Sequence, residues 1–386
     1  MARALSQRAK SARTSPIRSM TVECARVGGI NLAQGVCDTP VPEIVRRAAG
    51  EAIEAGANTY TRSDGIPELR AALAAKLRRD NQLDYDPNAE IVVTSGATGA
   101  FYVAAQALLE PADEVVLFEP YYGYHRNTLE ALGVRPVYVP LAGREFALDL
   151  PALESRLGPR TRALVINTPG NPSGKVWSRA ELEAVGALAR ERDLWLFTDE
   201  VYEHFVFDGA RHLSPASLPG LRERTITMNA LSKTFAITGW RIGWVAAPAP
   251  LCEAFAHLHD LVYVCAPAPL QHACATGLTK LDPEYYAAIG PEYQRKRDQL
   301  CAALADAGLP PNAPRGSYFA LADLSRLPGD TGDARALELL RRSGVACVPG
   351  TAFWRDGDAH RLGRFCFGKT DADLDEACRR LRNIQV

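Results

Sequence analysis

The sequence predicts an α/β protein in which a largely parallel sheet lies between helices, followed by a smaller α+β domain. In the middle of the chain, short apolar runs alternate with longer stretches of helical periodicity, which is typical of a parallel sheet covered by helices. After about Leu281 long helices with only short strands take over. The length of 386 residues also exceeds what one small core needs and fits two unequal domains.

The predicted strands of the large domain are short, rich in β-branched residues and uniformly apolar. Because they do not alternate with polar residues, we expect both faces of each strand to be buried. They span residues 91–94, 115–118, 163–166, 194–198, 225–228 and 244–247. Between them lie helical stretches such as residues 178–192, which begin at Ser178, a good N-cap, and carry acids in the first turn.

The predicted small domain begins with a long helix over residues 285–307. The apolar segment 316–321 follows, and then a helix over 334–343, short strands over 345–348 and 364–367, and a last helix from Asp371. We find no internal repeat and no low-complexity segment in the sequence.

Composition points to a small-molecule partner. The formal net charge is −1, so no global field would attract nucleic acid or an anionic membrane. No apolar run approaches the roughly 20 residues that span a bilayer. The N-terminus lacks the apolar core of a secretory signal. It is rich in Arg and Ser and free of acids up to Glu23, which leaves two interpretations, a basic tail and a transit peptide.

The nine cysteines indicate a cytoplasmic protein. They are an odd number without paired spacing, and most have apolar neighbours, as free buried thiols in a reducing compartment do. Neither C-x-x-C nor H-E-x-x-H occurs, so we expect no metal site.

One stretch with phosphate-binding character joins a predicted strand to a helix. Residues 94–100 read Thr-Ser-Gly-Ala-Thr-Gly-Ala. Such a turn offers free backbone N–H groups at the positive end of a helix dipole, which suits a phosphate. Glycines in such a turn also serve ordinary turn chemistry, so both interpretations stay open.

Two stretches place polar side chains at the carboxyl ends of buried strands, where α/β proteins bind ligands. Residues 167–175 form a tight loop in which Asn171 either reaches the crevice or makes an Asx turn. Asp199 ends the strand 194–198 and needs a cationic partner such as a protonated pyridine nitrogen, unless it caps the next helix. Tyr202 follows three residues later, on the same side of a helical turn.

Three cationic residues stand in stretches suited to an active site. Lys233 follows the strand 225–228 among small residues, and a desolvated lysine there has a lowered pKa and forms a Schiff base with a carbonyl. Arg241 can hold a phosphate in bidentate fashion. Arg364 lies in a short apolar strand and needs an anion, either a substrate carboxylate or an internal acid. A surface location of Lys233 remains the alternative.

Taken together, these residues resemble the fold-type I, class I and II aminotransferases that depend on pyridoxal 5'-phosphate (PLP). The resemblance runs from about residue 15 to the C-terminus. It rests on an ordered set of motifs: Asn-Pro-x-Gly at 171–174, Asp-Glu-Val-Tyr at 199–202, Ser-Lys-Thr-Phe with Thr-Gly-Trp-Arg-x-Gly at 232–243, and Arg-Phe-Cys-Phe at 364–367. Within the family, residues 30–35, 60–62, 119–122 and 316–319 are most similar to the kynurenine, glutamine and methionine aminotransferase branch.

The resemblance implies a domain organisation. We expect a mostly parallel seven-stranded sheet in a large PLP-binding domain, residues 45–281. Residues 1–44 would form an N-terminal arm and part of the small domain, and residues 282–386 the small C-terminal domain.

It also implies roles at the cofactor ring. Lys233 would bind PLP as a Schiff base, and Asp199 would pair with the pyridine nitrogen. Asn171 and Tyr202 would donate hydrogen bonds to the ring oxygen, and Tyr122 would stack on the ring. Lys233, Asp199 and Tyr202 are thus the expected catalytic residues.

The cofactor phosphate and the substrate have expected partners as well. The backbone around Ala97 and Thr98, with Ser232 and Arg241, would hold the phosphate. Tyr60 would reach the phosphate of the other subunit's cofactor, which implies a homodimer with shared active sites. Gly35, Asn171 and Arg364 would bind the substrate α-carboxylate.

Two positions depart from the pattern of the family. Many relatives have a phosphate-binding serine three residues before the lysine, and Ala230 stands there in this chain. In the branch pattern a proline follows the residue after Gly35, whereas Cys37 follows Val36 here. We therefore expect a changed phosphate contact and a different loop at the mouth of the site.

The implied activity is ping-pong transamination between an L-amino acid and a 2-oxo acid, with Lys233 moving the substrate proton. Neutral, sulfur-containing or aromatic side chains are the expected preference. An aspartate aminotransferase stays open, because Arg18, Arg26 and Arg62 are candidate cations for a second carboxylate. A carbon–sulfur β-lyase with the same machinery is a further alternative. A non-catalytic PLP-binding regulator is remote, because the resemblance leaves no room for a DNA-binding module.

Overall fold

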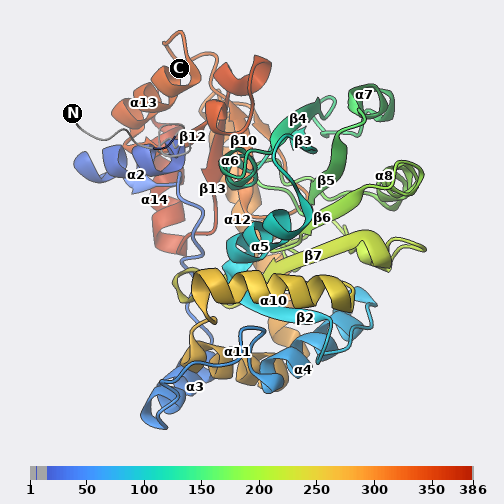
Figure 1. The fold of residues 1–386 in the computed structure, drawn as a ribbon. Coiled ribbons are helices and arrows are strands. Elements are labelled where there is room, and N and C mark those ends of the chain that lie inside the picture. Colours follow the sequence, from blue (N-terminus) through green and yellow to red (C-terminus); the bar gives the residue numbers. More distant parts are fainter. Residues whose placement is uncertain (1–5, 7–14, 385–386) are drawn as a thin grey trace, which may run out of the picture.

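The apolar runs of the sequence form a central seven-stranded sheet (Figure 1). The computed structural model describes residue 6 and residues 15–384. The strand order is β2-β8-β7-β6-β5-β3-β4. Strand β8 runs antiparallel to its neighbours β2 and β7, and the other neighbouring pairs run parallel. The strands are β2 (Ile91–Ser95), β3 (Glu114–Glu119), β4 (Arg135–Pro140), β5 (Thr161–Asn167), β6 (Trp195–Asp199), β7 (Thr225–Ala230) and β8 (Ile242–Ala246).

Helices cover both faces of this sheet, because successive residues of each strand point to opposite sides. Val115 and Leu117 of β3 pack with α5, α6 and α10, and Val116 and Phe118 pack with α7 and α8. Helices α3, α4 and α11 pack around β2 and β8. These helices are α3 (Glu43–Glu54), α4 (Pro67–Lys76), α5 (Gly96–Leu108), α6 (Gly123–Ala131), α7 (Leu150–Arg156), α8 (Arg179–Glu191), α10 (Ala249–Tyr263) and α11 (Ala268–Lys280). The predicted α/β fold is confirmed.

The predicted helix over 178–192 is α8, and its start follows from a capping box. The Ser178 side chain accepts a hydrogen bond from the Glu181 backbone N–H, and the Glu181 side chain accepts one from the Ser178 backbone. Leu182 and Val185 then fall on the face that packs against the sheet.

The smaller domain combines a four-stranded antiparallel sheet, in the order β12-β13-β10-β9, with helices on its outside (Figure 1). The N-terminal helix α2 lies against this domain, and β1 pairs in parallel with β11. The elements are α2 (Pro16–Arg26), β1 (Ile30–Asn31), α12 (Pro283–Asp306), β9 (Pro311–Asn312), β10 (Phe319–Asp323), α13 (Gly332–Ser343), β11 (Val345–Ala346), β12 (Val348–Pro349), β13 (Leu362–Cys366) and α14 (Asp371–Arg382).

The single strand predicted over residues 345–348 is wrong. The segment forms two strands of two residues in different sheets, because β11 pairs with β1 near the N-terminus while β12 pairs with β13. Cys347, fully buried, lies where the chain passes from one sheet to the other. The predicted domain boundaries at residues 44 and 281 stay a prediction.

The carboxyl ends of β5, β6 and β7 face the small domain. Asn167, Asp199 and Ala230 end these three strands, and the small-domain core reaches them through Tyr318 and Phe319. This edge therefore collects polar strand ends beneath a second apolar core. Among the residues described, we see no helix long and apolar enough to cross a membrane and no acid, His or Cys cluster able to hold a metal.

Candidate functional site

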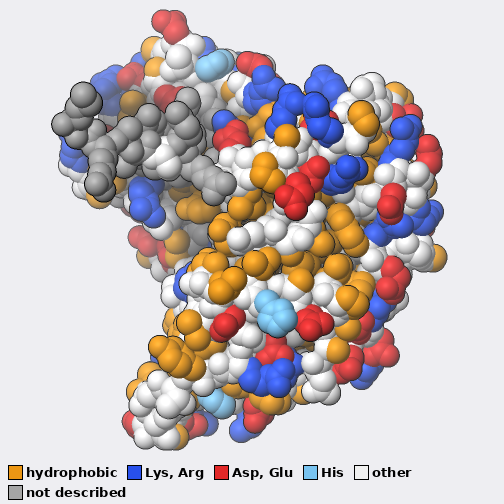
Figure 2. Space-filling view, in the orientation of Figure 1, with side chains coloured by type: hydrophobic (Ala, Val, Ile, Leu, Met, Phe, Trp, Pro, Cys, Tyr) orange, Lys and Arg blue, Asp and Glu red, His pale blue; other side chains and the backbone are white. Residues whose placement is uncertain are grey.

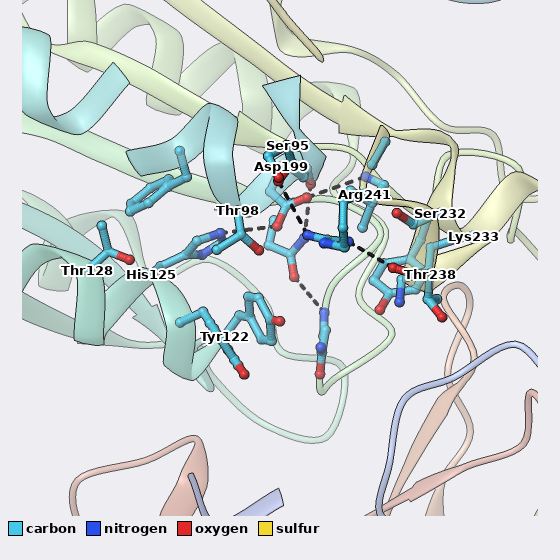
Figure 3. Close-up of a pocket in the computed structure, with 18 of the residues that line it drawn as sticks. Ser95, Thr98, Tyr122, His125, Thr128, Asp199, Ser232, Lys233, Thr238 and Arg241 are labelled. Carbon is cyan, nitrogen blue, oxygen red and sulfur yellow. Dashed lines mark hydrogen bonds and ion pairs between the residues drawn. The ribbon is translucent and has the colours of Figure 1, made fainter. Parts of the chain in front are cut away.

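A cavity of about 460 Å³ opens at this edge of the sheet, within the usual size range of small-molecule sites. Its walls come from the turn between β2 and α5, from α6, and from the loops after β5, β6 and β7 (Figure 3). The structure brings nine of the predicted site residues together here: Ala97, Thr98, Tyr122, Asn171, Asp199, Tyr202, Ser232, Lys233 and Arg241. An adjoining cavity of about 390 Å³ contains Gly35 and Arg364 and shares Asn171, Tyr202 and Lys233.

Lys233 projects into the point where the two cavities meet. It lies in the one-turn helix α9 (Leu231–Thr234), which follows β7 directly. Its Nζ donates a hydrogen bond to the Gly35 carbonyl oxygen at 3.2 Å. Desolvation in this enclosed position lowers the pKa of Lys233. This shift favours the neutral amine, the form that acts as a nucleophile or a base.

Asp199 is a buried carboxylate with a cationic or polar partner on one side and the cavity on the other. It is 6% exposed. His125 Nε2 lies 3.1 Å from Asp199 Oδ2, and the ring of His125 is held by contacts with Phe101 and Tyr122. Sequence reasoning missed His125, whose one signal is its position three residues after Tyr122. His125 fixes the orientation of the Asp199 carboxylate.

One end of the large cavity is built for an anion. The first N–H groups of α5 have no partner within the helix, and the helix dipole is positive there. Arg241 reaches the same point and donates hydrogen bonds to the carbonyl oxygens of Thr238 (2.9 Å) and Ser95 (3.4 Å). A Cβ at Gly96 would lie 2.2 Å from Arg241 Nη2, so this close approach requires glycine. Ser232 Oγ is buried nearby without a hydrogen-bond partner among the described residues.

Arg364 is an enclosed guanidinium whose N–H donors are only partly used. It is 1% exposed. It donates to Asn171 Oδ1 at 2.9 Å and to the Ala33 carbonyl oxygen at 2.5 Å, and its plane lies 4.1 Å from the Phe319 ring centre. Its Nε has no partner in the part of the chain that is described. Burial lowers the pKa of Arg364. A bound anion would give the guanidinium a further hydrogen-bond partner and would offset the burial of its charge.

The phenols of the site are hydrogen-bond donors at neutral pH. Burial raises the pKa of Tyr122, and the Asp199 charge raises it further. Burial likewise raises the pKa of Tyr202 well above its usual range. Tyr318, which sequence reasoning did not assign to the site, donates to the Gly35 carbonyl oxygen at 3.1 Å and fixes the loop opposite Lys233.

Tyr60 is the one predicted residue that the structure leaves outside both cavities. Its side chain is 82% exposed. It therefore contributes nothing to the site of its own subunit. This agrees with the expectation that Tyr60 contacts the cofactor phosphate of the other subunit.

These features fit PLP. The unpartnered Ser232 hydroxyl, the α5 N-terminus and Arg241 suit a phosphate at one end of the cavity. Asp199 lies at another wall and suits a protonated ring nitrogen. Lys233 lies within the same space, and burial lowers its pKa. Ala230 leaves no hydroxyl at its position, and the unpartnered Ser232 hydroxyl is one candidate to contact the phosphate instead.

Comparisons with known proteins agree on one family. The family model described as aminotransferase class I and II matches residues 27–381. The structure of N-succinyldiaminopimelate aminotransferase from Mycobacterium tuberculosis is 40% identical, covers 98% of this chain and 99% of its own, and superposes with a TM-score of 0.94. The rat (Rattus norvegicus) kynurenine–oxoglutarate transaminase 3 is 35% identical over 90% of this chain and 83% of its own. YbdL of Escherichia coli, reported with a methionine aminotransferase function, is 32% identical over 99% and 100%, with a TM-score of 0.94.

Proposed function

The chain belongs to the class I and II aminotransferases and depends on PLP, and we propose that it exchanges an amino group between an L-amino acid and a 2-oxo acid by a ping-pong mechanism. Recognition of this family from the sequence is confirmed, and so is the cofactor. The observation that carries the proposal is one cavity lined by both Lys233, whose pKa is lowered by burial, and Arg364, whose Nε has no hydrogen-bond partner among the described residues.

The substrate α-carboxylate binds Arg364 in this proposal. The guanidinium already has two of its donors committed to Asn171 and Ala33, which hold it in place. Arg364 and Gly35 line the cavity beside Lys233. A carboxylate fixed there brings the substrate Cα close to the Lys233 amine, and such positioning accounts for much of an enzymatic rate.

The cofactor is held by residues of both walls. Asp199 would pair with its ring nitrogen, Asn171 and Tyr202 would donate hydrogen bonds to the ring oxygen, and Tyr122 would contact the ring. The backbone at Ala97 and Thr98, together with Ser232 and Arg241, would hold the phosphate. When bound, PLP supplies an electron sink for the charge left on Cα after a proton is removed.

Lys233 moves that proton. Burial lowers its pKa, which favours the neutral amine that can accept a proton from Cα. Tyr202 and Tyr318 border the amine, with ring centres 5.8 and 5.6 Å from Nζ. These rings limit the access of water to the proton that Lys233 carries.

Neutral, sulfur-containing or aromatic donors fit the second cavity. Beyond Arg364 its wall contains apolar and aromatic side chains: Ile17, Val36, Tyr122, Tyr124 and Phe319. Such a wall binds apolar side chains by removing their surface from water. Two of the relatives, a methionine and a kynurenine aminotransferase, have names consistent with this preference.

Steady-state assays test the proposed donor preference. Purified enzyme with PLP is given a panel of L-amino acids, with pyruvate or 2-oxoglutarate as acceptor, and the 2-oxo acid formed from each donor is measured. We expect methionine, glutamine or an aromatic amino acid to give the highest kcat/KM. A highest value for aspartate contradicts the preference. Pyruvate, ammonia and thiol released from a cysteine conjugate without acceptor would indicate β-lyase chemistry.

A homodimer with shared active sites is part of the proposal. Figure 2 shows hydrophobic side chains gathered on the face over α10. This surface includes Leu261, 80% exposed, and its neighbours Val262, Tyr263 and Val264. An apolar patch of this kind is typical of a protein interface. Tyr60 is exposed and free to reach a partner.

Complementation between two inactive variants tests the shared site. Lys233→Ala and Tyr60→Ala subunits are mixed and allowed to reassemble. A mixed dimer has one complete site, built from Lys233 of one subunit and Tyr60 of the other, so about a quarter of wild-type activity should return. Activity that stays at the mean of the two separate variants would contradict sharing, and sedimentation would show whether the dimer forms.

We also propose a cytoplasmic location. All nine cysteines are free, and most are buried. Desolvation raises the pKa of buried thiols such as Cys274 and Cys347, so they remain protonated and unreactive. Free thiols of this number are typical of a reducing compartment.

A further inference from the structure

The second cavity has to bind two different substrates in turn if the enzyme is a ping-pong aminotransferase, so the following inference rests on the proposed function. The donor and the acceptor both place an α-carboxylate and a reacting carbon beside Arg364 and Lys233. They differ in the group that extends from that carbon, and helix α2 contributes one side of the cavity wall through Ile17, Arg18 and Thr21. Side chains on this wall are therefore candidates to decide which groups are accepted.

Arg18 of α2 is a cation on that side. It lines the cavity that also contains Gly35, Lys233 and Arg364. None of the described residues lining this cavity is acidic. Arg18 is exposed and makes no side-chain hydrogen bond or ion pair with the rest of the described chain.

The other cations of the site already have partners or proposed ligands. Arg364 is fixed by Asn171 and Ala33, and Arg241 by Thr238 and Ser95 at the phosphate end. Lys233 is the reacting amine. Arg18 therefore adds a positive charge to the cavity that neither the α-carboxylate nor the cofactor accounts for.

Arg26 and Arg62, the other two candidate cations for a second carboxylate, form ion pairs outside this cavity. Arg26 Nε pairs with Glu23 at 2.9 Å, one turn along the same helix. Arg62 donates two hydrogen bonds to Asp64, at 2.9 and 2.8 Å. Neither belongs to the described lining of the cavity beside Lys233. The structure thus separates Arg18 from two residues that sequence alone leaves equivalent.

We propose that Arg18 binds the second carboxylate of a dicarboxylic substrate, and that the acceptor is a 2-oxo dicarboxylic acid. A guanidinium matches a carboxylate with two parallel hydrogen bonds. The α-carboxylate lies on Arg364 and the distal carboxylate on Arg18, so the acceptor is held at both ends. A neutral donor uses the apolar wall of the same cavity and leaves Arg18 in water, which costs little because this side chain is exposed.

The test compares two acceptors in the holoenzyme. With one neutral donor held constant, kcat/KM is measured for 2-oxoglutarate, which has a second carboxylate, and for pyruvate, which lacks it. In Arg18→Ala we expect the ratio of the two values to fall by about 10- to 100-fold, the range for loss of a charge-assisted hydrogen bond. The loss should lie mainly in KM, because the distal group does not react. Arg18→Lys should recover part of the ratio.

Arg26→Ala is the matched control, since Arg26 lies on the same exposed helix but pairs with Glu23, and its ratio should equal that of the wild type. An unchanged ratio in Arg18→Ala, with transamination intact, overturns the inference and leaves the proposed function standing. An equal loss with both acceptors also overturns it, because it assigns Arg18 a general structural role. A wild-type enzyme that transaminates neither acceptor contradicts the proposed function itself.

Discussion

Replacing Lys233 with alanine is expected to abolish turnover and remove the absorbance of covalently bound cofactor. The Lys233 amine is the nearest mobile proton carrier to the substrate Cα in the proposed site, and loss of such a group costs on the order of 10²–10⁴ in rate by itself. Loss of the covalent attachment adds to this. The measurements are kcat under saturating substrate and the visible spectrum of the purified protein with PLP.

Lys280→Ala serves as the control for this experiment. Lys280 is an exposed lysine at the end of α11, so its removal should change neither the spectrum nor kcat. A Lys233→Ala protein that keeps both the wild-type spectrum and wild-type turnover would show that the chemistry depends on another residue. Intact folding of the variant is checked by far-ultraviolet circular dichroism and by its unfolding midpoint.

Replacing Glu203 with alanine should cost about 3–5 kcal/mol of unfolding free energy, the range for breaking a buried ion pair. Glu203 follows Tyr202 and pairs with Lys76, and both side chains are buried. Its carboxylate also accepts hydrogen bonds from Asn81 at 3.0 Å and from Asn229 at 2.7 Å. Without it, the Lys76 ammonium stays buried with only Asn81 as a partner.

This network joins two parts of the active site, so the loss should also reach catalysis. Asn229 is the next-to-last residue of β7 and precedes Lys233 by four residues. Glu203 directly follows Tyr202 in the sequence. The cost is measured by urea unfolding. Glu183→Ala is the control, because Glu183 forms an exposed pair with Arg179 that is worth at most about 1 kcal/mol. Equal costs for the two variants would contradict a stabilising role for the buried pair.

Acid should weaken the same interaction. Burial tends to raise the pKa of Glu203, but the charges of Lys76, His204 and His212 and the hydrogen bond from Lys76 together outweigh it, so the pKa falls from its ordinary 4.5 to about 2. The folded protein therefore keeps this carboxylate ionised where the unfolded chain protonates it. The stabilisation is fully present above the unfolded pKa and is lost as the pH falls from 4.5 towards 2. The stability difference between wild type and Glu203→Gln should narrow between pH 7 and about pH 3.5, as urea unfolding at the two values would show.

Much of the fold follows from local sequence patterns. Strands buried on both faces have a simple signal, an unbroken apolar run, and both ends of all six predicted strands lie within two residues of the observed ends. Strand β4 (Arg135–Pro140) lacks that signal, because it begins with Arg135 and contains two prolines at the edge of the sheet. The antiparallel direction of β8 depends on which strands it joins, and no local pattern encodes that.

The candidate site follows a similar division. Residues within motifs at strand ends, such as Asp199 and Lys233, are predictable because a charged group buried at that edge needs a partner or a ligand to offset its desolvation. His125 and Glu203 are not, because their importance lies in partners far away in sequence: His125 pairs with Asp199, and Glu203 with Lys76. The selection of Arg18 from three arginines likewise requires the position of α2 against the second cavity.

The most direct test of the proposed function separates the two halves of the reaction. Holoenzyme is mixed with a neutral L-amino acid in the absence of acceptor, and both the cofactor absorbance and the released 2-oxo acid are followed. We predict a change in absorbance with one 2-oxo acid released per active site, and a return to the original spectrum when a second 2-oxo acid is added. A spectrum that no amino acid changes, or continuous product release without acceptor, would contradict ping-pong transamination.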